Sequence, residues 1–174
     1  MKKIKLAIVG CAGRMGNEII KQIGNFPNCE LVSAIEKKKS KYINKKVKKI
    51  IISDNKEIAF QQADIIIDFS SPKSSIESAK FAAKLKKKLV IGTTGLNNVQ
   101  INNIKQASGR TAIVFAPNMS IGINLLLALV KSTSKVFFNN ETSIEILDIH
   151  HKHKKDAPSG TALALGNAIA REKN

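Results

Sequence analysis

The stretch from His150 to Thr161 gathers the side chains best suited to move a proton and to bind an anion. Its histidines titrate near neutral pH, and its lysines carry a compact positive charge. Ser159-Gly160-Thr161 stands at the expected start of a helix, where backbone N–H groups and hydroxyls can hold a carboxylate. The stretch therefore predicts a site that protonates or stabilises a small anionic substrate.

Two other interpretations of this stretch stay open at this stage. Three histidines lie within four residues, His150, His151 and His153, but no Cys or Glu accompanies them as a further metal ligand. We therefore expect no metal. A basic turn exposed to solvent is the second alternative.

Glycines near the N-terminus predict a binding site for a dinucleotide. Gly10, Gly13 and Gly16 follow a short apolar run, Ile4 to Val9, and open a helical pattern. Glycine permits positive φ and lets the backbone approach a pyrophosphate, to which a helix N-terminus offers N–H groups and partial positive charge. The spacing is one residue wider than G-x-G-x-x-G, so the prediction depends on the strand–turn–helix context. A glycine-rich packing turn is the alternative.

An acidic and a basic residue follow the second expected strand. Glu36 lies twenty residues beyond Gly16, where a carboxylate can accept hydrogen bonds from the adenosine ribose. Lys37 comes next and can pair with a 2′-phosphate, although further lysines nearby are equally available as solvated charge. A chain with both groups could accept NADH and NADPH.

Polar residues also end three other expected strands. Gly92-Thr93-Thr94-Gly95 lies at the carboxyl end of a strand, where open α/β sheets bind ligands, and suits a loop along a ribose or nicotinamide. A capped turn is an equal alternative. Asn118 holds a comparable position after a later strand, and Asp68 ends another. For Asp68, nothing local separates a structural helix partner from a catalytic residue.

Short apolar runs alternate with helical patterns through residues 1–118, which we expect to form a dinucleotide-binding domain. The alternation predicts an α/β fold with a Rossmann-like, doubly wound parallel sheet. The expected strands are Ile4–Val9, Leu31–Ile35, Ile50–Ile52, Ile65–Phe69, Leu89–Ile91 and Ala112–Phe115. Helices are expected after Gly16, over 54–62, from Ser71-Pro72 to about Lys88 and over 97–108, with a lysine-rich surface loop from Lys37 to Lys49.

The pattern changes in residues 119–174, which we expect to begin an α+β substrate domain. The expected elements are a helix from Gly122 to Phe137 capped by Ser120, a strand with Ile144, Ile146 and Ile149, and a helix from Thr161 to about Glu172. A single strand leaves its edges unpaired, so we expect this domain to be incomplete.

Composition excludes several classes of protein. The 174 residues are 43% hydrophobic, enough for a core, and the formal net charge of +16 comes almost entirely from lysine. Arginines and aromatic residues, on which nucleic-acid readers depend, are scarce, so we expect no nucleic-acid partner. Two cysteines fit a reduced, cytoplasmic setting. The apolar run after Lys5 is too short for a signal peptide and no segment is long enough to span a membrane, so we expect no membrane partner.

Together these motifs resemble the 4-hydroxy-tetrahydrodipicolinate reductase family, long called dihydrodipicolinate reductases. The likeness covers the whole chain and rests on Gly10 to Gly16, Gly92 to Gly95 and above all His150 to Thr161, with Asp68-Phe69-Ser70 and Ala116 to Ser120 in the same order. It implies a Rossmann domain, a mixed-sheet substrate domain and a homotetramer. It also implies reduction of a cyclic dicarboxylate, 4-hydroxy-tetrahydrodipicolinate, to tetrahydrodipicolinate with NADPH or NADH, in diaminopimelate and lysine biosynthesis.

The resemblance assigns roles residue by residue. It implies catalysis by His150 and Lys154, and substrate binding by His151, Gly160 and Thr161. We add Ser159 to the predicted substrate residues, because it stands with Gly160 and Thr161 at the helix start that can hold a carboxylate. Family members with arginine at the place of Lys37 use it for the NADPH phosphate; lysine lacks the planar fork, which leaves the preference open. The implied cofactor contacts are Gly10, Cys11, Ala12, Gly13, Arg14, Met15, Glu36, Lys37, Gly92, Thr93, Thr94, Ala116, Pro117, Asn118 and Met119.

One departure from the family concerns length. Family members continue well beyond the position of Asn174, and their additional part completes the substrate sheet and supplies the usual subunit contact. We therefore expect a C-terminally shortened member without that contact. An inactive remnant that still binds a dinucleotide, a fragment of a longer frame and a chain completed by a second polypeptide are the alternatives.

Overall fold

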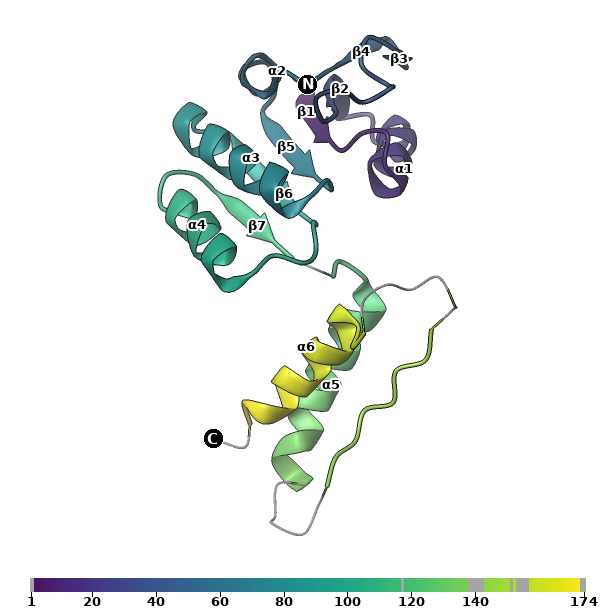
Figure 1. Cartoon of the computed structure of the whole chain (residues 1–174), viewed down its shortest axis with the longest axis vertical. Coiled ribbons are helices and arrows are strands. Elements are labelled where there is room, and N and C mark those ends of the chain that lie inside the picture. The colour runs from purple at the N-terminus through teal and green to yellow at the C-terminus, as the bar shows by residue number, and fades with distance from the viewer. Residues whose placement is uncertain (1, 117, 138–142, 151, 153–156, 173–174) are drawn as a thin grey trace. The chain divides into compact units, whose positions relative to one another are not determined.

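The computed structural model of the chain describes residues 2–116, 118–137, 143–150, 152 and 157–172. The chain separates into two compact units, Met1–Ala116 and Pro117–Asn174 (Figure 1). We refer to them as the N-terminal and the C-terminal unit and describe each by itself.

The N-terminal unit is a sheet of seven strands with helices between them (Figure 1). Its strands are β1 (Ile4–Val9), β2 (Cys29–Ile35), β3 (Lys46–Val47), β4 (Ile50–Ser53), β5 (Ile65–Asp68), β6 (Lys88–Ile91) and β7 (Ile113–Phe115). Its helices are α1 (Arg14–Gln22), the short 3-10 turn η1 (Ile23–Asn25), α2 (Lys56–Gln62), α3 (Pro72–Leu85) and α4 (Asn98–Ser108).

The strand order is β3-β4-β2-β1-β5-β6-β7, and every pair except β3–β4 is parallel. The chain builds outward from β1 to β2 and β4, then returns to the other side of β1 through β5. This reversal is the topological switch point of a doubly wound sheet, and it puts the carboxyl ends of β1, β2 and β5 at one edge, where such sheets bind ligands. The Rossmann-like fold predicted from the sequence is confirmed.

Two apolar clusters cover the two faces of the sheet, because successive side chains of a strand point to opposite faces. In β1, Ala7 and Val9 belong to the cluster that also contains residues of α2, α3 and α4. Leu6 and Ile8 belong to the other cluster, with Ile20 of α1. A strand buried on both faces reads as a nearly continuous apolar run, which is how β1 was recognised in the sequence.

Local signals fix the helix starts. The Ser71 hydroxyl accepts a hydrogen bond from the Ser74 N–H at 3.4 Å, and Pro72 takes the first helical position of α3, as the sequence predicts. Asn97 and Gln100 form a reciprocal capping box at the start of α4. The expected lysine-rich loop differs from the structure at its end, where Lys46–Val47 pairs antiparallel with β4 as β3.

The described part of the C-terminal unit contains two helices, α5 (Ile121–Phe137) and α6 (Gly160–Ala170), which pack against each other. They run in the same direction, since the Asn118 amide lies 3.4 Å from the Thr161 hydroxyl near their starts. Near their ends, Lys131 and Lys135 pair with the Glu172 carboxylate at 3.5 and 3.3 Å. The predicted helices are confirmed within a residue or two.

The prediction of a strand that contains Ile144, Ile146 and Ile149 is wrong. Residues 143–150 are described, but they form no hydrogen-bonded ladder with any other described residue. A strand needs a partner to satisfy its backbone groups, and the alternating apolar pattern alone cannot supply one.

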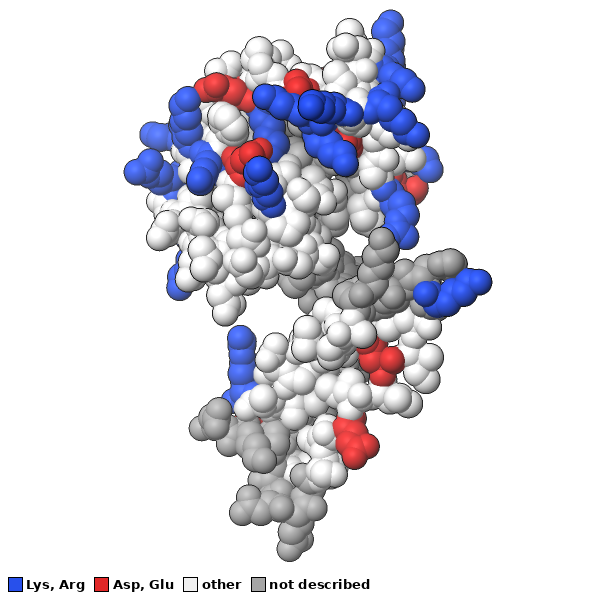
Figure 2. Space-filling model, in the orientation of Figure 1, with Lys and Arg blue, Asp and Glu red and all other residues white. Residues whose placement is uncertain are grey.

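Basic side chains are spread over the face of the N-terminal unit shown in Figure 2, and acidic side chains lie among them. They are distributed over several elements, which agrees with a general enrichment in lysine. Among the described residues, no helix is both long and apolar enough to cross a lipid bilayer.

The packing predicts the effect of truncating Phe60. Its side chain is 0% exposed, and its ring lies edge-on to the Phe81 ring with the two ring centroids 6.3 Å apart. Phe60→Ala should lower the free energy of unfolding by about 3–5 kcal/mol, because the lost apolar contacts leave a cavity. The matched control is Phe26→Ala, since Phe26 is 55% exposed and should cost no more than about 0.5 kcal/mol. Urea unfolding followed by circular dichroism measures both. Equal shifts of the two midpoints would contradict the described core.

Candidate functional site

The turn between β1 and α1 is shaped by glycines that leave no room for a side chain. Gly10 has φ +78°, and a Cβ there would lie 2.4 Å from the Phe69 carbonyl oxygen. A Cβ on Gly16 would lie 2.1 Å from the Gly10 carbonyl oxygen. The α1 helix therefore sits directly against the end of β1, as close as backbone allows.

The N-terminus of α1 has the properties of an anion site. Its N-cap residue is Gly13, so no side chain caps the first N–H groups, and no acidic residue lies in the first turn. Gly13, Arg14 and Met15 are exposed at this end. A helix start of this kind offers free N–H donors and the positive end of the helix dipole to a phosphate.

Glu36 follows β2 and reaches the same turn. Its Oε1 accepts a hydrogen bond from the Ala12 N–H at 3.0 Å. The Glu36 side chain is half-buried, whereas Lys37 and Lys38 beside it are exposed. One acidic and two basic groups are thus held near the glycine turn, as the sequence predicts for Glu36 and Lys37.

These groups line one cleft of about 920 Å³ at the carboxyl edge of the sheet. The volume lies within the range of cavities that hold cofactors and other small ligands. Its wall also includes the segment between β5 and α3, which faces the glycine turn across the switch point. Among the lining residues are Gly10, Gly13, Glu36, Lys37, Ser70 and Ser71.

Cys11, also in the glycine turn, is a buried residue of the core. Burial, with a smaller contribution from the Glu36 charge, raises the pKa of its thiol to about 12. A thiol that stays protonated at neutral pH is a poor nucleophile. Its place in the turn therefore fits packing below the loop, and any contact to a ligand would come from its backbone.

Asp68 at the end of β5 organises the loop after β6. The carboxylate is fully buried, and its Oδ1 accepts hydrogen bonds from the N–H and the hydroxyl of Ser70, with the Ser75 hydroxyl 3.2 Å away. The Thr93 hydroxyl lies 3.4 Å from the same oxygen and accepts a hydrogen bond from the Ser75 hydroxyl at 2.8 Å. The structure thus describes Asp68 as a structural centre, an option that the sequence left open.

The two threonines of the Gly92–Gly95 loop point in different directions. The Thr93 side chain is 5% exposed and belongs to the Asp68 network, whereas Thr94 is exposed. A Cβ on Gly92 would collide with the Phe69 ring at 2.1 Å, so the ring packs directly on the loop backbone. The loop can offer a ligand its backbone and the Thr94 side chain, while the Thr93 hydroxyl is engaged inside the protein.

The remaining predicted cofactor residues flank the boundary between the units. In the N-terminal unit, the Ala116 N–H extends the sheet by donating to the Ile91 carbonyl at 3.1 Å. In the C-terminal unit, the Asn118 side chain accepts a hydrogen bond from the Ser120 N–H at 2.9 Å, and Met119 is exposed. Pro117 lies outside the described residues.

In the C-terminal unit, the start of α6 is held by Asp148. Ser159 is the N-cap residue of α6, and its hydroxyl accepts a hydrogen bond from the Ala162 N–H at 3.0 Å. The Ser159 N–H and hydroxyl both donate to the Asp148 carboxylate, at 2.9 and 3.2 Å. With its polar groups used in this way and its side chain 3% exposed, Ser159 supports the helix start. Gly160 is exposed and Thr161 is half-buried at the same helix start.

His150 contacts the same carboxylate. Its Nε2 lies 2.6 Å from the Asp148 Oδ1. The Ser159 N–H, ahead of the smaller contributions of the Ser159 hydroxyl and His150, holds the pKa of Asp148 below its usual value. An ionised Asp148 therefore joins the predicted proton donor to the predicted anion site.

Two of the predicted catalytic and substrate residues, Lys154 and His151, lie outside the described residues, as does His153. Within the part of the chain that the structure describes, no cluster of His, Cys, Asp or Glu is arranged to hold a metal ion. Asp148 was missed in the sequence. Its position two residues before His150 in an extended segment is a signal that could have pointed to it, because alternate residues share a face.

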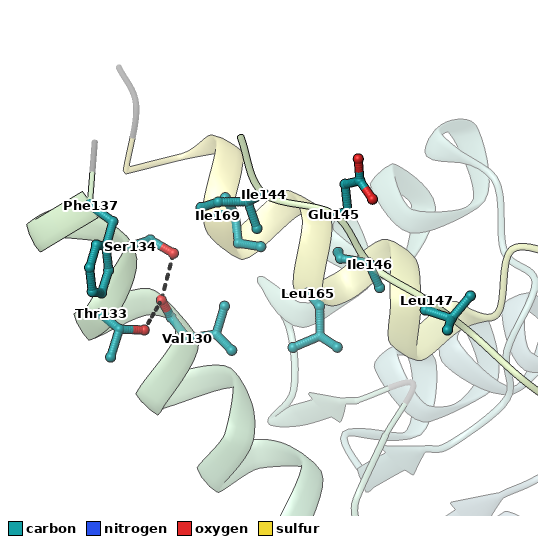
Figure 3. A pocket seen from close by; sticks show the side chains of 10 residues that line it. All are labelled: Val130, Thr133, Ser134, Phe137, Ile144, Glu145, Ile146, Leu147, Leu165 and Ile169. Carbon is teal, nitrogen blue, oxygen red and sulfur yellow. Dashed lines mark hydrogen bonds between the residues drawn. The ribbon is translucent and has the colours of Figure 1, made fainter. Parts of the chain in front are cut away.

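The C-terminal unit has a cavity of its own, of about 500 Å³, between α5, α6 and residues 144–147 (Figure 3). The Thr133 and Ser134 hydroxyls at its edge bond to the Val130 carbonyl within α5, at 3.2 and 2.7 Å. Leu165, Ile169 and other apolar side chains make up most of the remaining wall. Glu145 is the one ionisable residue among the described residues that line this cavity, so we assign it no part in the predicted chemistry.

Comparisons with known proteins cover both units. The model for the family described as dihydrodipicolinate reductase, N-terminus, matches residues 4–119, and that for dihydrodipicolinate reductase, C-terminus, matches residues 122–174. The 4-hydroxy-tetrahydrodipicolinate reductase of Pelagibacter ubique is 48% identical over 174 residues, which are 100% of this chain and 66% of that protein. The enzyme of that name from Buchnera aphidicola is 41% identical over 99% of this chain and 67% of its own length.

A solved structure, a dipicolinate-bound dihydrodipicolinate reductase from Paenisporosarcina sp. TG-14, matches with a TM-score of 0.81 at 26% identity. The match covers 98% of this chain and 67% of that one. The chain thus spans about two thirds of the length of the relatives it matches. Two family models, sequence similarity over the whole of this chain and a shared fold confirm the resemblance inferred from the motifs. The chain belongs to the dihydrodipicolinate reductase family.

Proposed function

We propose that the chain reduces 4-hydroxy-tetrahydrodipicolinate to tetrahydrodipicolinate with NADPH or NADH, a step of diaminopimelate and lysine biosynthesis in the cytoplasm. The observation that carries the proposal is the glycine turn, where Gly10 and Gly16 exclude any Cβ and α1 begins without a capping side chain. Family membership and the names of the relatives support the choice of reaction.

The residues present fit a nicotinamide dinucleotide. The pyrophosphate would lie at the N-terminus of α1, against the backbone of residues 10–15. Each Glu36 oxygen accepts one backbone hydrogen bond, Oε1 from the Ala12 N–H at 3.0 Å and Oε2 from the Lys37 N–H at 3.3 Å. A carboxylate oxygen can accept more than one hydrogen bond, so Glu36 would also accept from the adenosine ribose, and Lys37 would pair with a 2′-phosphate where one is present. We infer that both NADH and NADPH are accepted. When bound, the dinucleotide supplies the hydride.

The Gly92–Thr94 loop and Ala116 to Met119 would contact the nicotinamide side of the cofactor. Within this set, Thr94 would act through its side chain and Thr93 through its backbone, because the Thr93 hydroxyl is bonded in the Asp68 network. The buried network gives the loop one conformation, and a fixed loop loses little entropy when a ligand binds.

A cyclic dicarboxylate would bind at the start of α6. The N–H groups of Gly160 and Thr161 and the Thr161 hydroxyl would hold one carboxylate, as free groups of a helix N-terminus do. His151 would assist from the adjoining segment. Ser159 would contribute indirectly, through the cap that fixes the first turn.

The net reaction consumes one hydride and one proton and releases water. Negative charge develops on the substrate ring as the hydride arrives, and it must be neutralised. His150 would donate the proton, and the Lys154 ammonium would stabilise the charge or share the donation. The negative charge of Asp148 would be balanced by the protonated form of His150, to which it is bonded, so that the pair as a whole would not repel the substrate carboxylates.

The first test is oxidation of NADPH and NADH by the purified 174-residue chain. The substrate is generated in the assay from pyruvate and aspartate semialdehyde by the preceding synthase. We expect turnover that stops when the synthase is omitted, and His150→Gln should slow it by about 10²- to 10⁴-fold while cofactor binding is retained.

An active full-length relative in the same assay serves as the positive control. Dinucleotide binding without turnover would favour a non-catalytic dinucleotide-binding protein. Salt-dependent binding to any DNA duplex, with indifference to NADPH, would favour a nucleic-acid-associated protein. Loss of cofactor binding equal to the loss of turnover in His150→Gln would exclude the catalytic role of His150.

The glycine turn gives a second prediction. Gly10→Ala should abolish measurable NADPH binding, because the new Cβ collides with the Phe69 carbonyl oxygen and distorts the turn. Gly95→Ala is the matched control: Gly95 has the same φ of +78°, but nothing lies within 4 Å of its Cβ position. It should pay only the strain of positive φ, about 1–2 kcal/mol. Fluorescence titration measures binding, and comparable loss in both variants would contradict the role of the close approach.

Lys37 gives a third prediction. Lys37→Ala should weaken NADPH binding by about tenfold or more, because a charge-assisted contact to the 2′-phosphate is lost. NADH binding should stay unchanged. Lys41→Ala, in the same lysine-rich loop but outside the lining of the cleft, is the control. Parallel losses for NADH and NADPH would exclude a specific contact between Lys37 and the 2′-phosphate.

A further inference from the structure

The Asp148 carboxylate joins two parts of the proposed active site that are separated in sequence. On one side its Oδ1 lies 2.6 Å from the His150 Nε2. On the other, its Oδ2 accepts the Ser159 N–H at 2.9 Å, with the Ser159 hydroxyl 3.2 Å from Oδ1. Both oxygens are therefore engaged, one with a proposed proton donor and one with the N-cap residue of α6.

The contact to His150 determines where the imidazole carries its hydrogen. An ionised carboxylate only accepts hydrogen bonds, so the nitrogen that faces it must be the donor. In the neutral ring the hydrogen then resides on Nε2, and Nδ1 becomes the nitrogen that takes up and releases a proton. Second partners of this kind commonly set the tautomer and the orientation of a functional histidine.

The contact to Ser159 fixes the carboxylate in turn. Ser159 is almost fully buried, and its hydroxyl also caps the Ala162 N–H, so it cannot move without disturbing the first turn of α6. The side chains of Asp148 and His150 are 25% and 37% exposed, which leaves the ring accessible to a substrate. The arrangement thus has a rigid end at the helix and an open end at the imidazole.

We propose that Asp148 is a positioning residue, which holds the His150 ring in one tautomer and one orientation relative to the anion-binding start of α6. The proposal rests on the proposed reductase function and adds to it a residue that does not itself touch the substrate. Asp148 would keep the proton donor and the carboxylate site at a constant separation, so that a substrate bound at Gly160 and Thr161 meets a correctly placed ring. Alignment of this kind contributes to the rate of the chemical step more than to binding.

The test compares Asp148→Asn with Asp148→Glu. Asparagine has the same shape and can still accept the Ser159 N–H, but it can turn an amide N–H toward the ring and so favour the other tautomer. We expect kcat to fall by about 10- to 100-fold, by analogy with carboxylates behind other functional histidines. KM for the substrate and the affinity for NADPH should change less than about threefold, because uniform binding is retained. Glutamate restores a charged acceptor and should recover most of kcat.

Glu145→Gln is the matched control. Glu145 lies in the same extended segment and lines the apolar cavity, so its replacement removes one negative charge away from the proposed site. It should leave kcat unchanged. An equal fall of kcat in this variant would show a general charge effect and overturn the assignment to Asp148.

A second readout does not depend on turnover. The chain has three histidines, so long-range proton–nitrogen NMR spectra can be assigned with His150→Gln and recorded where the rings are neutral. We expect the His150 hydrogen on Nε2 in the unmodified chain and on Nδ1 in Asp148→Asn. If the hydrogen moves from Nε2 to Nδ1 as expected but no variant turns over, the contact between Asp148 and His150 is supported while the reductase proposal fails. A His150 tautomer that is the same in both proteins, or a fall of kcat that Asp148→Glu does not restore, would overturn the inference.

Discussion

The N-terminal unit depends on a close approach of backbone to backbone at the end of β1. The Gly10 carbonyl oxygen lies where a Cβ of Gly16 would be, and the backbone of Phe69 lies where a Cβ of Gly10 would be. These two contacts fix α1 on β1 and bring the end of β5 against the turn. The Ala12 N–H then reaches Glu36 at the end of β2. The cleft follows from this geometry, because the three strand ends cannot separate without opening the turn.

The buried network around Asp68 has the corresponding role for the loop after β6. A fully buried carboxylate is costly unless it is hydrogen-bonded, and Asp68 Oδ1 is surrounded by donors from Ser70, Ser75 and Thr93. Asp68 Oδ2 is buried without a partner among the described residues. A network of this kind stabilises less than an apolar cluster of the same size, but it specifies one arrangement of the loop. The buried polar residues below the cleft thus fix its shape, and we propose the exposed polar residues as contacts to ligands.

Sequence alone predicted most of the N-terminal unit, because a strand buried on both faces, such as Ile4–Val9, and a Ser71-Pro72 helix start are local signals. It also predicted the glycine turn and the position of Glu36 after the second strand, whereas the cofactor contacts of both stay predictions. It could not decide which threonine of Thr93-Thr94 points inward, since that depends on Asp68 and Ser75 in other elements. The same limit applies to residues 143–150, whose alternating pattern is local, whereas the pairing that defines a strand is not.

Residues 143–150 pair with no described strand, but Asp148 and His150 in this segment still have defined contacts. The bonds between Asp148 and Ser159 join two residues that are eleven positions apart in the sequence, and Ser159 is anchored by the helix that it caps. Closing a loop of this length costs only a modest entropy, which two hydrogen bonds to an ionised carboxylate can offset. Within the described residues, His150 is thus linked to the start of α6 through Asp148. We propose that the helix cap at Ser159, acting through Asp148, sets the position of the His150 ring relative to the start of α6.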